Sequence, residues 1–195
     1  MIEVTPLTGP YIRDALPALA DLRIRVFREW PYLYDGSPEY EEKYLNKFSQ
    51  AKDALIVIAR DSTHIVGAST ASPLVGHADE FAEPFRQRGY EPNDVFYFGE
   101  SVLLPEYRGQ GIGHAFFDHR EKHARQMEKF KTAAFCAVTR SDSDPRKPAN
   151  YFPLDTFWSR RGFQKEEKIA ASLGWKEVDS AGSVPHTLQF WIKPL

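Results

Sequence analysis

Short runs of apolar residues recur along the chain and predict a series of β-strands. The runs are rich in Val, Ile, Phe and Tyr, which favour strands, and polar or glycine-containing segments separate them. The polar turn "DSTH" lies between two of the runs and predicts an antiparallel hairpin. The predicted strands are "IEVT", "ALIVIAR", "HIVGASTAS", "DVFYFGESVLL", "FKTAAFCAVTR", "FQKEEKIA" and "HTLQFWIK".

Apolar residues at helical spacing fill several of the intervening segments. The first helix is predicted over residues 11–30. A second begins after Ser37, a residue type that caps helices, with Pro38 at the first helical position. Further helices are predicted over about residues 113–129, within "ADEFAEPFRQRG" and within "PLDTFWSRRGF".

The order of these elements predicts a mixed sheet. The strand, helix and strand that follow Asp94 require a right-handed parallel crossover, whereas the earlier hairpin is antiparallel. No linker rich in proline, glycine or serine divides the chain. We therefore expect one α/β domain over residues 1–195, in which helices cover a mixed, mostly antiparallel sheet.

Composition and charge exclude several classes of protein. The net charge is −2 and no basic stripe is present, so nucleic acid is not an expected partner. The single cysteine, Cys136, excludes an internal disulfide and is expected to be a buried strand residue. The longest apolar run, residues 54–59, is far shorter than a membrane span, and "MIEVTP" does not resemble a secretory leader. These features predict a cytoplasmic protein without a membrane partner, and they leave open whether it forms a homodimer.

The stretch "LLPEYRGQGIGHAFF", residues 103–117, places three glycines where a strand passes into a helix. Glycines let backbone N–H groups at a helix N-terminus approach a phosphate closely. Two common phosphate loops do not fit: His114 follows Gly113 where the Walker loop needs lysine, and Phe116 stands where the dinucleotide fingerprint needs glycine. A glycine-rich connection without a ligand remains the alternative from spacing alone.

The same residues carry a family resemblance. Arg108, Gly111 and Gly113, between a strand and a helix, resemble the pyrophosphate loop of the GNAT superfamily of acyl-CoA-dependent N-acetyltransferases. The surrounding "FYFGESVLLPEYRGQGIGHAFFDHREKHA" and the downstream "FWSRRGF" extend the resemblance over most of the chain. It implies a sheet in which two central parallel strands splay apart, and acyl transfer from acetyl-CoA to an amine in a ternary complex without a metal.

The resemblance also implies which residues bind the acyl donor. Backbone groups of one strand segment would bind pantetheine, and the glycine-rich loop would bind pyrophosphate. Asn150 lies one residue out of register with the asparagine that the family commonly uses. The expected donor-binding residues are Val102, Leu103, Leu104, Arg108, Gly109, Gln110, Gly111, Ile112, Gly113, His114 and Asn150.

Amine acetylation needs a group that accepts a proton, since a free amine is mostly protonated at neutral pH. Glu100 follows the apolar "DVFYFG" and precedes the expected pantetheine segment, so we expect it to be the general base. A structural carboxylate in an ion pair is the alternative. The tyrosine that many members use to protonate the thiolate is replaced here by Trp158, and Tyr151 is the substitute that we expect.

Two other groups of residues are candidate sites. Trp30, Tyr32 and Tyr34 follow the first helix, where the family builds its acceptor wall, and packing onto the core is the alternative role. His119 and His123 are four residues apart, but no third metal ligand accompanies them, so no metal site is expected.

The function expected from the sequence is transfer of an acetyl group from acetyl-CoA to a primary amine of a small molecule or peptide. A CoA-binding regulator or a catalytically inactive relative is the alternative, which Trp158 mildly favours and Glu100 opposes.

Overall fold

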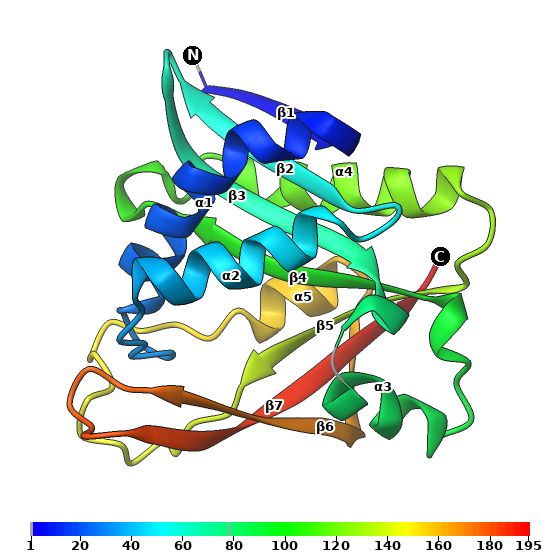
Figure 1. Ribbon diagram of the computed structural model, residues 1–195. Coiled ribbons are helices and arrows are strands. Elements are labelled where there is room, and N and C mark those ends of the chain that lie inside the picture. Colours follow the sequence, from blue (N-terminus) through cyan, green and yellow to red (C-terminus); the bar gives the residue numbers. More distant parts are fainter. Residues whose placement is uncertain (1, 78) are drawn as a thin grey trace.

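Seven strands form one mixed sheet in the computed structural model, which describes residues 2–77 and 79–195 (Figure 1). The spatial order is β1-β2-β3-β4-β5-β7-β6. Neighbouring strands are antiparallel except for the parallel pair β4 and β5, which confirms the predicted mixed sheet. The strands are β1 (Ile2–Thr8), β2 (Leu55–Asp61), β3 (His64–Pro73), β4 (Val95–Leu103), β5 (Thr132–Val138), β6 (Gln164–Lys176) and β7 (Ser183–Pro194).

Helices cover both faces of the sheet (Figure 1). The pair α1 and α2 packs on one face and α4 on the other, while α3 packs beside β6. The α-helices are α1 (Ile12–Phe27), α2 (Pro38–Ser49), α3 (Asp79–Arg86), α4 (Ile112–Gln126) and α5 (Asp155–Arg160). Short 3-10 helices occupy η1 (Gly9–Tyr11), η2 (Leu74–Gly76), η3 (Pro92–Asp94) and η4 (Pro105–Tyr107).

Local signals place several of these boundaries where the sequence predicts them. The Ser37 side chain accepts a hydrogen bond from the backbone N–H of Tyr40, which caps α2 as expected. Gly162 adopts a positive φ of 87° just after α5, the conformation that ends helices most readily at glycine. The final two strands are longer than predicted, and their pairing is interrupted by an irregularity between Lys165 and Ala170.

The parallel strands β4 and β5 separate soon after they begin. Their pairing covers only Val95 to Tyr97 on β4 and Thr132 to Ala134 on β5, although both strands continue beyond these residues. The far part of β4 therefore keeps β3 on one side and loses its sheet neighbour on the other. This is the splayed pair that the sequence resemblance implies.

A β-bulge interrupts β4 at the point where it leaves β5. Ser69 pairs with Ser101 and Ala71 with Phe98, so Thr70 alone faces both Gly99 and Glu100. Alternate residues of a regular strand share a face, and without the bulge Glu100 would lie on the α4 face with Phe98. The extra residue turns the Glu100 side chain to the α1 face.

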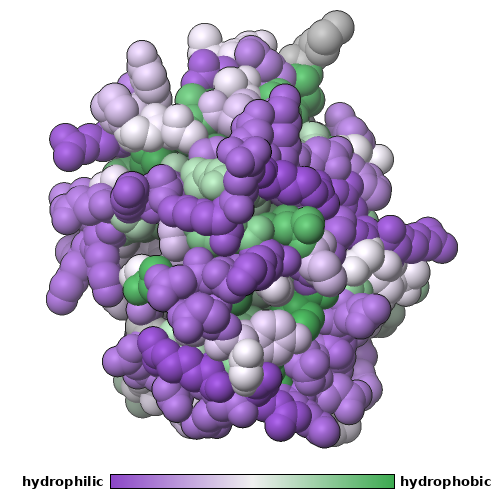
Figure 2. All heavy atoms as spheres, turned by 90° about the vertical axis from the view of Figure 1, so that its right-hand side faces the viewer, coloured by the Kyte–Doolittle hydropathy of each residue, from purple (hydrophilic) through white to green (hydrophobic). Residues whose placement is uncertain are grey.

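One face of the molecule is mainly polar. Figure 2 shows this face, on which hydrophilic side chains predominate and apolar atoms occur in smaller groups among them. Within the described ranges, no helix is long and apolar enough to cross a lipid bilayer.

Candidate functional site

The glycine-rich loop adopts the conformation that its glycines permit. Gly109 and Gly111 have positive φ angles of 77° and 83°, and Gly111 is the N-cap residue of α4. A side chain at either position would point into open space, so backbone conformation and not crowding requires glycine there. The backbone N–H groups of the first helical turn have no intrahelical acceptors and carry the positive end of the helix dipole. The loop is therefore suited to an anionic group.

Side chains of the loop are positioned by contacts with its surroundings. Arg108 donates from Nε to the carbonyl of Leu103 and from Nη2 to Glu29 just beyond α1, at 3.1 Å in both cases. His114 lies edge-on to Phe157 of α5 with its Nδ1 3.4 Å from Arg161. Ile112 is buried beneath the loop, whereas Gln110 is exposed.

The edge of β4 that faces β5 is open next to this loop. Residues Ser101, Val102 and Leu103 pair with β3 on their other side, and the pairing with β5 ends at Tyr97. Leu104 donates its backbone N–H to Val66. Backbone groups along an open strand edge can bind an extended ligand in the way that they bind another strand. The predicted donor-binding segment and loop are thus continuous in space, whereas Asn150 is exposed in the loop that precedes α5.

Glu100 belongs to a buried cluster of charges on the α1 face. Its Oε2 lies 2.8 Å from Nη1 of Arg23, and Arg23 Nε lies 2.5 Å from Oε2 of Glu41 on α2. The hydroxyl of Tyr44 donates to Glu100 at 3.5 Å, and that of Tyr34 donates to Glu41 at 2.9 Å. Burial by itself lowers the pKa of Arg23, but its ion pairs with Glu100 and Glu41 raise that pKa above its ordinary value. The guanidinium therefore stays charged between the two carboxylates.

The second carboxylate oxygen of Glu100 is buried and has no hydrogen-bond partner within the described residues. The bulge that orients it is fixed by Thr70, whose Oγ1 accepts a hydrogen bond from the backbone N–H of Glu100 at 3.2 Å. A Cβ atom at Gly99 would lie 2.5 Å from the same oxygen, so this close approach requires glycine. Glu100 therefore has one paired oxygen and, among the described residues, one buried oxygen without a partner, on the segment of β4 that has lost its β5 neighbour.

Aromatic residues of the α1–α2 connection lie near this carboxylate. The Tyr32 ring packs on Phe27 and Trp175, and burial together with the nearby Cys136 raises the pKa of its hydroxyl. Trp30 packs edge-on against Tyr151 at 6.1 Å between ring centroids, and its buried Nε1 has no partner within the described residues. The Tyr34 hydroxyl instead donates a hydrogen bond to Glu41. Trp30 and Tyr151 thus pack together, Tyr32 packs between the end of α1 and β6, and Tyr34 supports the charge cluster.

Cys136 is a strand residue, as expected, but its burial is intermediate and not complete. It lies on β5 just beyond the last residue paired with β4, with its Sγ 3.0 Å from the Tyr97 hydroxyl. Burial raises the pKa of the Cys136 thiol to about 12, so almost none of it is thiolate at neutral pH. This thiol is therefore a poor nucleophile.

Trp158 has a packing role. Its ring lies 5.0 Å from that of Phe135 and 5.2 Å from that of Trp191, between α5 and the central strands. Trp158, which stands where the resemblance would place a tyrosine, thus forms part of an aromatic core.

The sequence did not identify the partners that orient the glutamate. Arg23 and Tyr44 come from α1 and α2, and Arg120 of α4 bonds to the Thr70 carbonyl and the Ser101 hydroxyl from the opposite face. Arg120 lies between His119 and His123 on α4, and its side chain is buried between Phe98 and Phe117. Only the isolated Gly99 within a strand signals the bulge.

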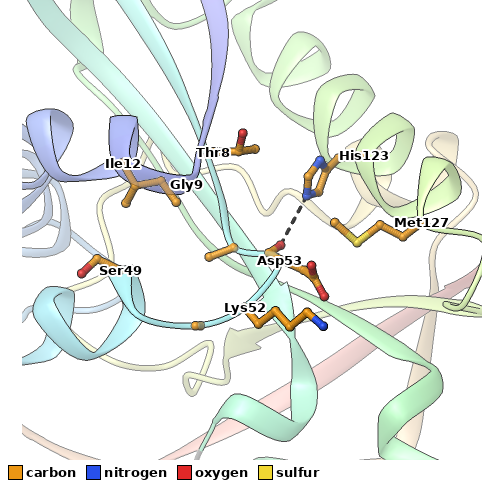
Figure 3. Close-up of a pocket in the computed structure, with 10 residues that line it drawn as sticks. Thr8, Gly9, Ile12, Ser49, Lys52, Asp53, His123 and Met127 are labelled. Carbon is orange, nitrogen blue, oxygen red and sulfur yellow. Dashed lines mark hydrogen bonds between the residues drawn. The ribbon is translucent and has the colours of Figure 1, made fainter.

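A shallow depression lies elsewhere, between the start of α1, the α2–β2 connection and the C-terminal end of α4 (Figure 3). In it, His123 Nε2 lies 3.3 Å from the carbonyl oxygen of Asp53. His123 is eleven residues beyond Ile112, or about 16 Å along the helix axis. This depression is therefore separate from the glycine-rich loop.

Comparison with known proteins places the chain in a family. The sequence model of the acetyltransferase (GNAT) family matches residues 19–147, about two thirds of the chain. The chain belongs to the GNAT acetyltransferase family. In this GNAT protein the match includes the glycine-rich loop, Glu100 and the α1–α2 connection, whereas the candidate residues Asn150 and Tyr151 lie just beyond it. No curated protein matches the sequence.

Solved structures share the GNAT fold over the full length of the chain. The PaiA N-acetyltransferase of Thermoplasma acidophilum, in complex with coenzyme A, has a TM-score of 0.59 at 15% identity and covers 100% of this chain and 99% of its own. A ribosomal-protein-alanine N-acetyltransferase of Brucella melitensis has a TM-score of 0.61 at 14% identity, with 99% of both chains covered. NAA60 of Arabidopsis thaliana, in complex with a bisubstrate analogue, also has a TM-score of 0.61 at 14% identity and covers 100% and 98%. At these identities the likeness establishes the fold alone.

Proposed function

We propose that this GNAT protein transfers an acetyl group from acetyl-CoA to a primary amine of a small molecule or peptide. The observation that carries the proposal is the position of Glu100, a buried carboxylate on the segment of β4 beyond its pairing with β5, with one oxygen that has no partner among the described residues. An amine beside this segment would donate a hydrogen bond to that oxygen. The glycine-rich loop continues from the same strand, so donor and acceptor would meet there.

In the proposed reaction, the first turn of α4 and Arg108 bind the pyrophosphate, and the open edge of β4 binds the pantetheine arm through backbone groups. Glu100 accepts a proton from the amine as its nitrogen attacks the acetyl carbonyl. The raised thiol pKa of Cys136 opposes an acetyl-cysteine intermediate, which supports direct transfer in a ternary complex.

Tyr151 is proposed to protonate the departing thiolate. Burial, followed by the charge of Asp155, raises the pKa of its hydroxyl, so the hydroxyl keeps its proton at neutral pH. Tyr151→Phe keeps the ring that packs on Trp30 and should lower turnover by about 10²-fold, the lower end of the range for general acid–base catalysis. The dissociation constant of acetyl-CoA should not change. Turnover equal to that of the wild type would assign the proton to water or to the substrate.

Donor binding is tested by thermal stability. Acetyl-CoA at 100 times its dissociation constant should stabilise the protein by about 2.7 kcal/mol. Gly111→Ala should reduce this stabilisation strongly, because alanine disfavours the positive φ that aims the loop N–H groups.

Gly89→Ala is the matched control for the loop variant. Gly89 also has a positive φ, 79°, with open space around a Cβ, but it follows α3 and not the loop. Both variants should lose similar stability without ligand, about 1–2 kcal/mol, and only the loop variant should lose the response to acetyl-CoA. An equal response in the two variants would remove the loop from the donor site.

The catalytic proposal is tested by following thiol release from acetyl-CoA with a panel of primary amines. Amine-dependent release with stoichiometric N-acetyl product supports it. A CoA-binding regulator is the second candidate, which the packing role of Trp158 favours because no tyrosine stands at that position. Stabilisation by acetyl-CoA without turnover of any amine would favour the regulator.

A further inference from the structure

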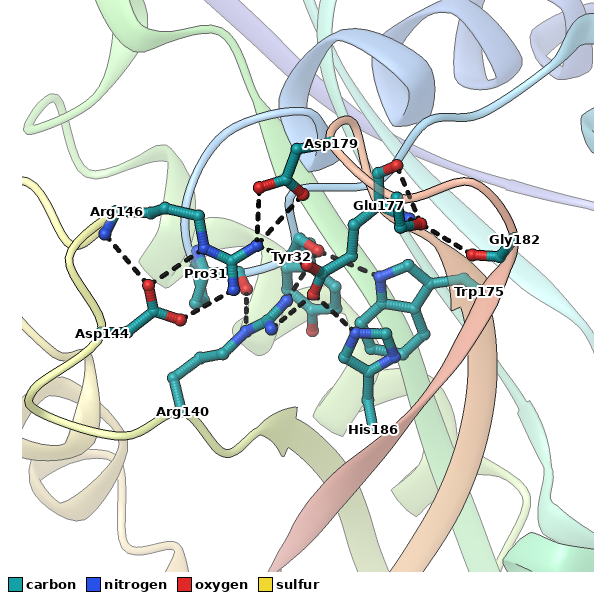
Figure 4. A network of polar contacts seen from close by, with 11 residues as sticks. Pro31, Tyr32, Arg140, Asp144, Arg146, Trp175, Glu177, Asp179, Gly182 and His186 are labelled. Atoms are coloured by element: carbon teal, nitrogen blue, oxygen red, sulfur yellow. Dashed lines mark hydrogen bonds and ion pairs between the residues drawn. The ribbon is translucent and has the colours of Figure 1, made fainter.

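Glu177 lies at the centre of a cluster that joins three separate segments (Figure 4). It directly follows β6, and its carboxylate is 8% exposed. Oε1 lies 2.5 Å from Nη1 of Arg140 and 2.8 Å from Nε2 of His186, and Oε2 lies 2.5 Å from Nη1 of Arg146. The two arginines belong to the loop after β5, and His186 belongs to β7.

Two side chains connect this cluster to the backbone of the α1–α2 connection through three hydrogen bonds (Figure 4). Arg140 donates from Nε to the carbonyl of Pro31 at 2.6 Å and from Nη2 to the carbonyl of Tyr32 at 2.9 Å. Trp175 donates from Nε1 to the same Tyr32 carbonyl at 3.0 Å. The backbone that carries Tyr32 is thus held by a residue bonded to Glu177 and by a residue two positions before it.

Backbone hydrogen bonds fix the next part of the same connection on the β6–β7 hairpin. Asp35 donates its N–H to the carbonyl of Lys176, and Val178 donates its N–H to the carbonyl of Leu33, both at 2.8 Å. Tyr34 and Glu177 form an antiparallel bridge between these two bonds. The position of Tyr32 relative to Glu100 therefore depends on the contacts that fix the β6–β7 hairpin against the α1–α2 connection.

The charge of Glu177 matters for this arrangement. Burial by itself raises its pKa, but the hydrogen bonds from His186, Arg146 and Arg140 outweigh this effect and lower the pKa to about 2. The carboxylate is therefore ionised at neutral pH and forms charge-assisted hydrogen bonds, which are stronger than neutral ones. The His186 ring also stacks on Trp175, with 3.5 Å between centroids and 6° between planes, which supports the indole that reaches Tyr32.

We propose that Glu177 is a positioning residue for the amine acceptor, acting through Arg140 and the hairpin to hold the Pro31–Tyr32 backbone against the site of Glu100. The inference rests on the proposed function, since it assigns the α1–α2 connection to the acceptor. It predicts that Glu177 affects acceptor recognition and leaves binding of acetyl-CoA at the α4 loop intact.

The kinetic test compares Glu177→Gln with Asp179→Asn. Asp179 is more than half exposed and, among the described residues, pairs only with Arg146 of the same cluster, so it provides a matched change of charge. Glu177→Gln should raise the KM of the acceptor by roughly tenfold or more, because even a small displacement of the Pro31–Tyr32 backbone would misplace the groups that bind the acceptor. Its kcat should change less, and the dissociation constant of acetyl-CoA and the activity of Asp179→Asn should stay at wild-type values.

Trp175→Phe provides a second variant that preserves folding. It keeps an aromatic ring beside His186 and Tyr32 but removes the N–H that bonds to the Tyr32 carbonyl. It should show the same rise in acceptor KM, smaller in size, with unchanged binding of acetyl-CoA. A wild-type KM in both folded variants would overturn the proposal.

Hydrogen–deuterium exchange tests the positioning role without any activity. The amide protons of residues 31–35 should exchange several-fold faster in Glu177→Gln than in the wild type or in Asp179→Asn, while those of residues 112–126 should not change. Unchanged exchange at residues 31–35 would overturn the positioning role. Faster exchange in a protein that acetylates no amine would instead contradict only the proposed enzymatic function.

Discussion

Replacing Glu100 by glutamine is expected to lower amine acetylation by roughly 10²–10⁴-fold, the range that general-base catalysis typically contributes. Glutamine keeps the shape of the side chain, and its amide oxygen can still accept a hydrogen bond from Arg23. It cannot accept the proton that the attacking amine releases. Because the carboxylate pairs with Arg23 of α1 and with no residue of the glycine-rich loop among the described contacts, stabilisation by acetyl-CoA should be retained.

Glu41→Gln is the matched control. Glu41 is fully buried and pairs with the same guanidinium as Glu100, but it lies on α2 and both its oxygens have partners. If the loss in Glu100→Gln came only from changed charge around Arg23, Glu41→Gln should lose activity to a similar extent. A far smaller loss in Glu41→Gln assigns the effect to proton transfer.

The pH dependence separates the two roles further. The deficit of Glu100→Gln should shrink as pH rises, since more of the amine is then neutral and needs no base. The deficit is the ratio of the wild-type to the variant rate, and pre-steady-state acetylation of one amine by both proteins across pH measures it directly. A deficit that is constant with pH, or full activity at pH 7, would return Glu100 to a structural role in the charge cluster.

The sequence predicted the parts of the site that are encoded locally. A strand, a glycine-rich turn and a helix start lie within fifteen residues, and the structure gives Gly109 and Gly111 the positive φ angles that only glycine adopts readily. The general-base candidate was also predictable, because it follows the apolar core of β4 and precedes the loop.

The surroundings of Glu100 could not be predicted in the same way. Its partner Arg23 is 77 residues away in the sequence, and helical periodicity describes such an arginine as an exposed residue. The bulge decides which face Glu100 occupies, and it depends on the hydroxyl of Thr70 across the sheet. The position of Trp30 and Tyr32 depends likewise on Arg140 and Trp175, which lie more than a hundred residues downstream.

The buried charge cluster leads to the second large prediction, which concerns stability. Arg23→Met should lower the free energy of unfolding by about 3–5 kcal/mol, because removal of one partner leaves buried charges uncompensated. Both carboxylates of the cluster are nearly inaccessible, with exposed fractions of 0% for the Glu41 side chain and 5% for that of Glu100. Methionine preserves much of the contact with Phe27 and Tyr44, over whose rings the guanidinium now lies. The measurement is urea unfolding followed by circular dichroism.

Arg25→Met on the same helix is the control, since its pair with Asp21 is more than half exposed and should contribute less than about 1 kcal/mol. The double variant Arg23→Met with Glu41→Gln removes one of the two carboxylates that the single variant leaves without a cation. It should therefore be more stable than Arg23→Met alone, because contacting residues of one network do not act additively. Two results would contradict a role of Arg23 in offsetting repulsion between Glu41 and Glu100. One is a loss of unfolding free energy in Arg23→Met no larger than that in Arg25→Met. The other is a double variant no more stable than Arg23→Met. Recovery in the double variant would show that Arg23 holds two carboxylates together at the site, one of which is the proposed base.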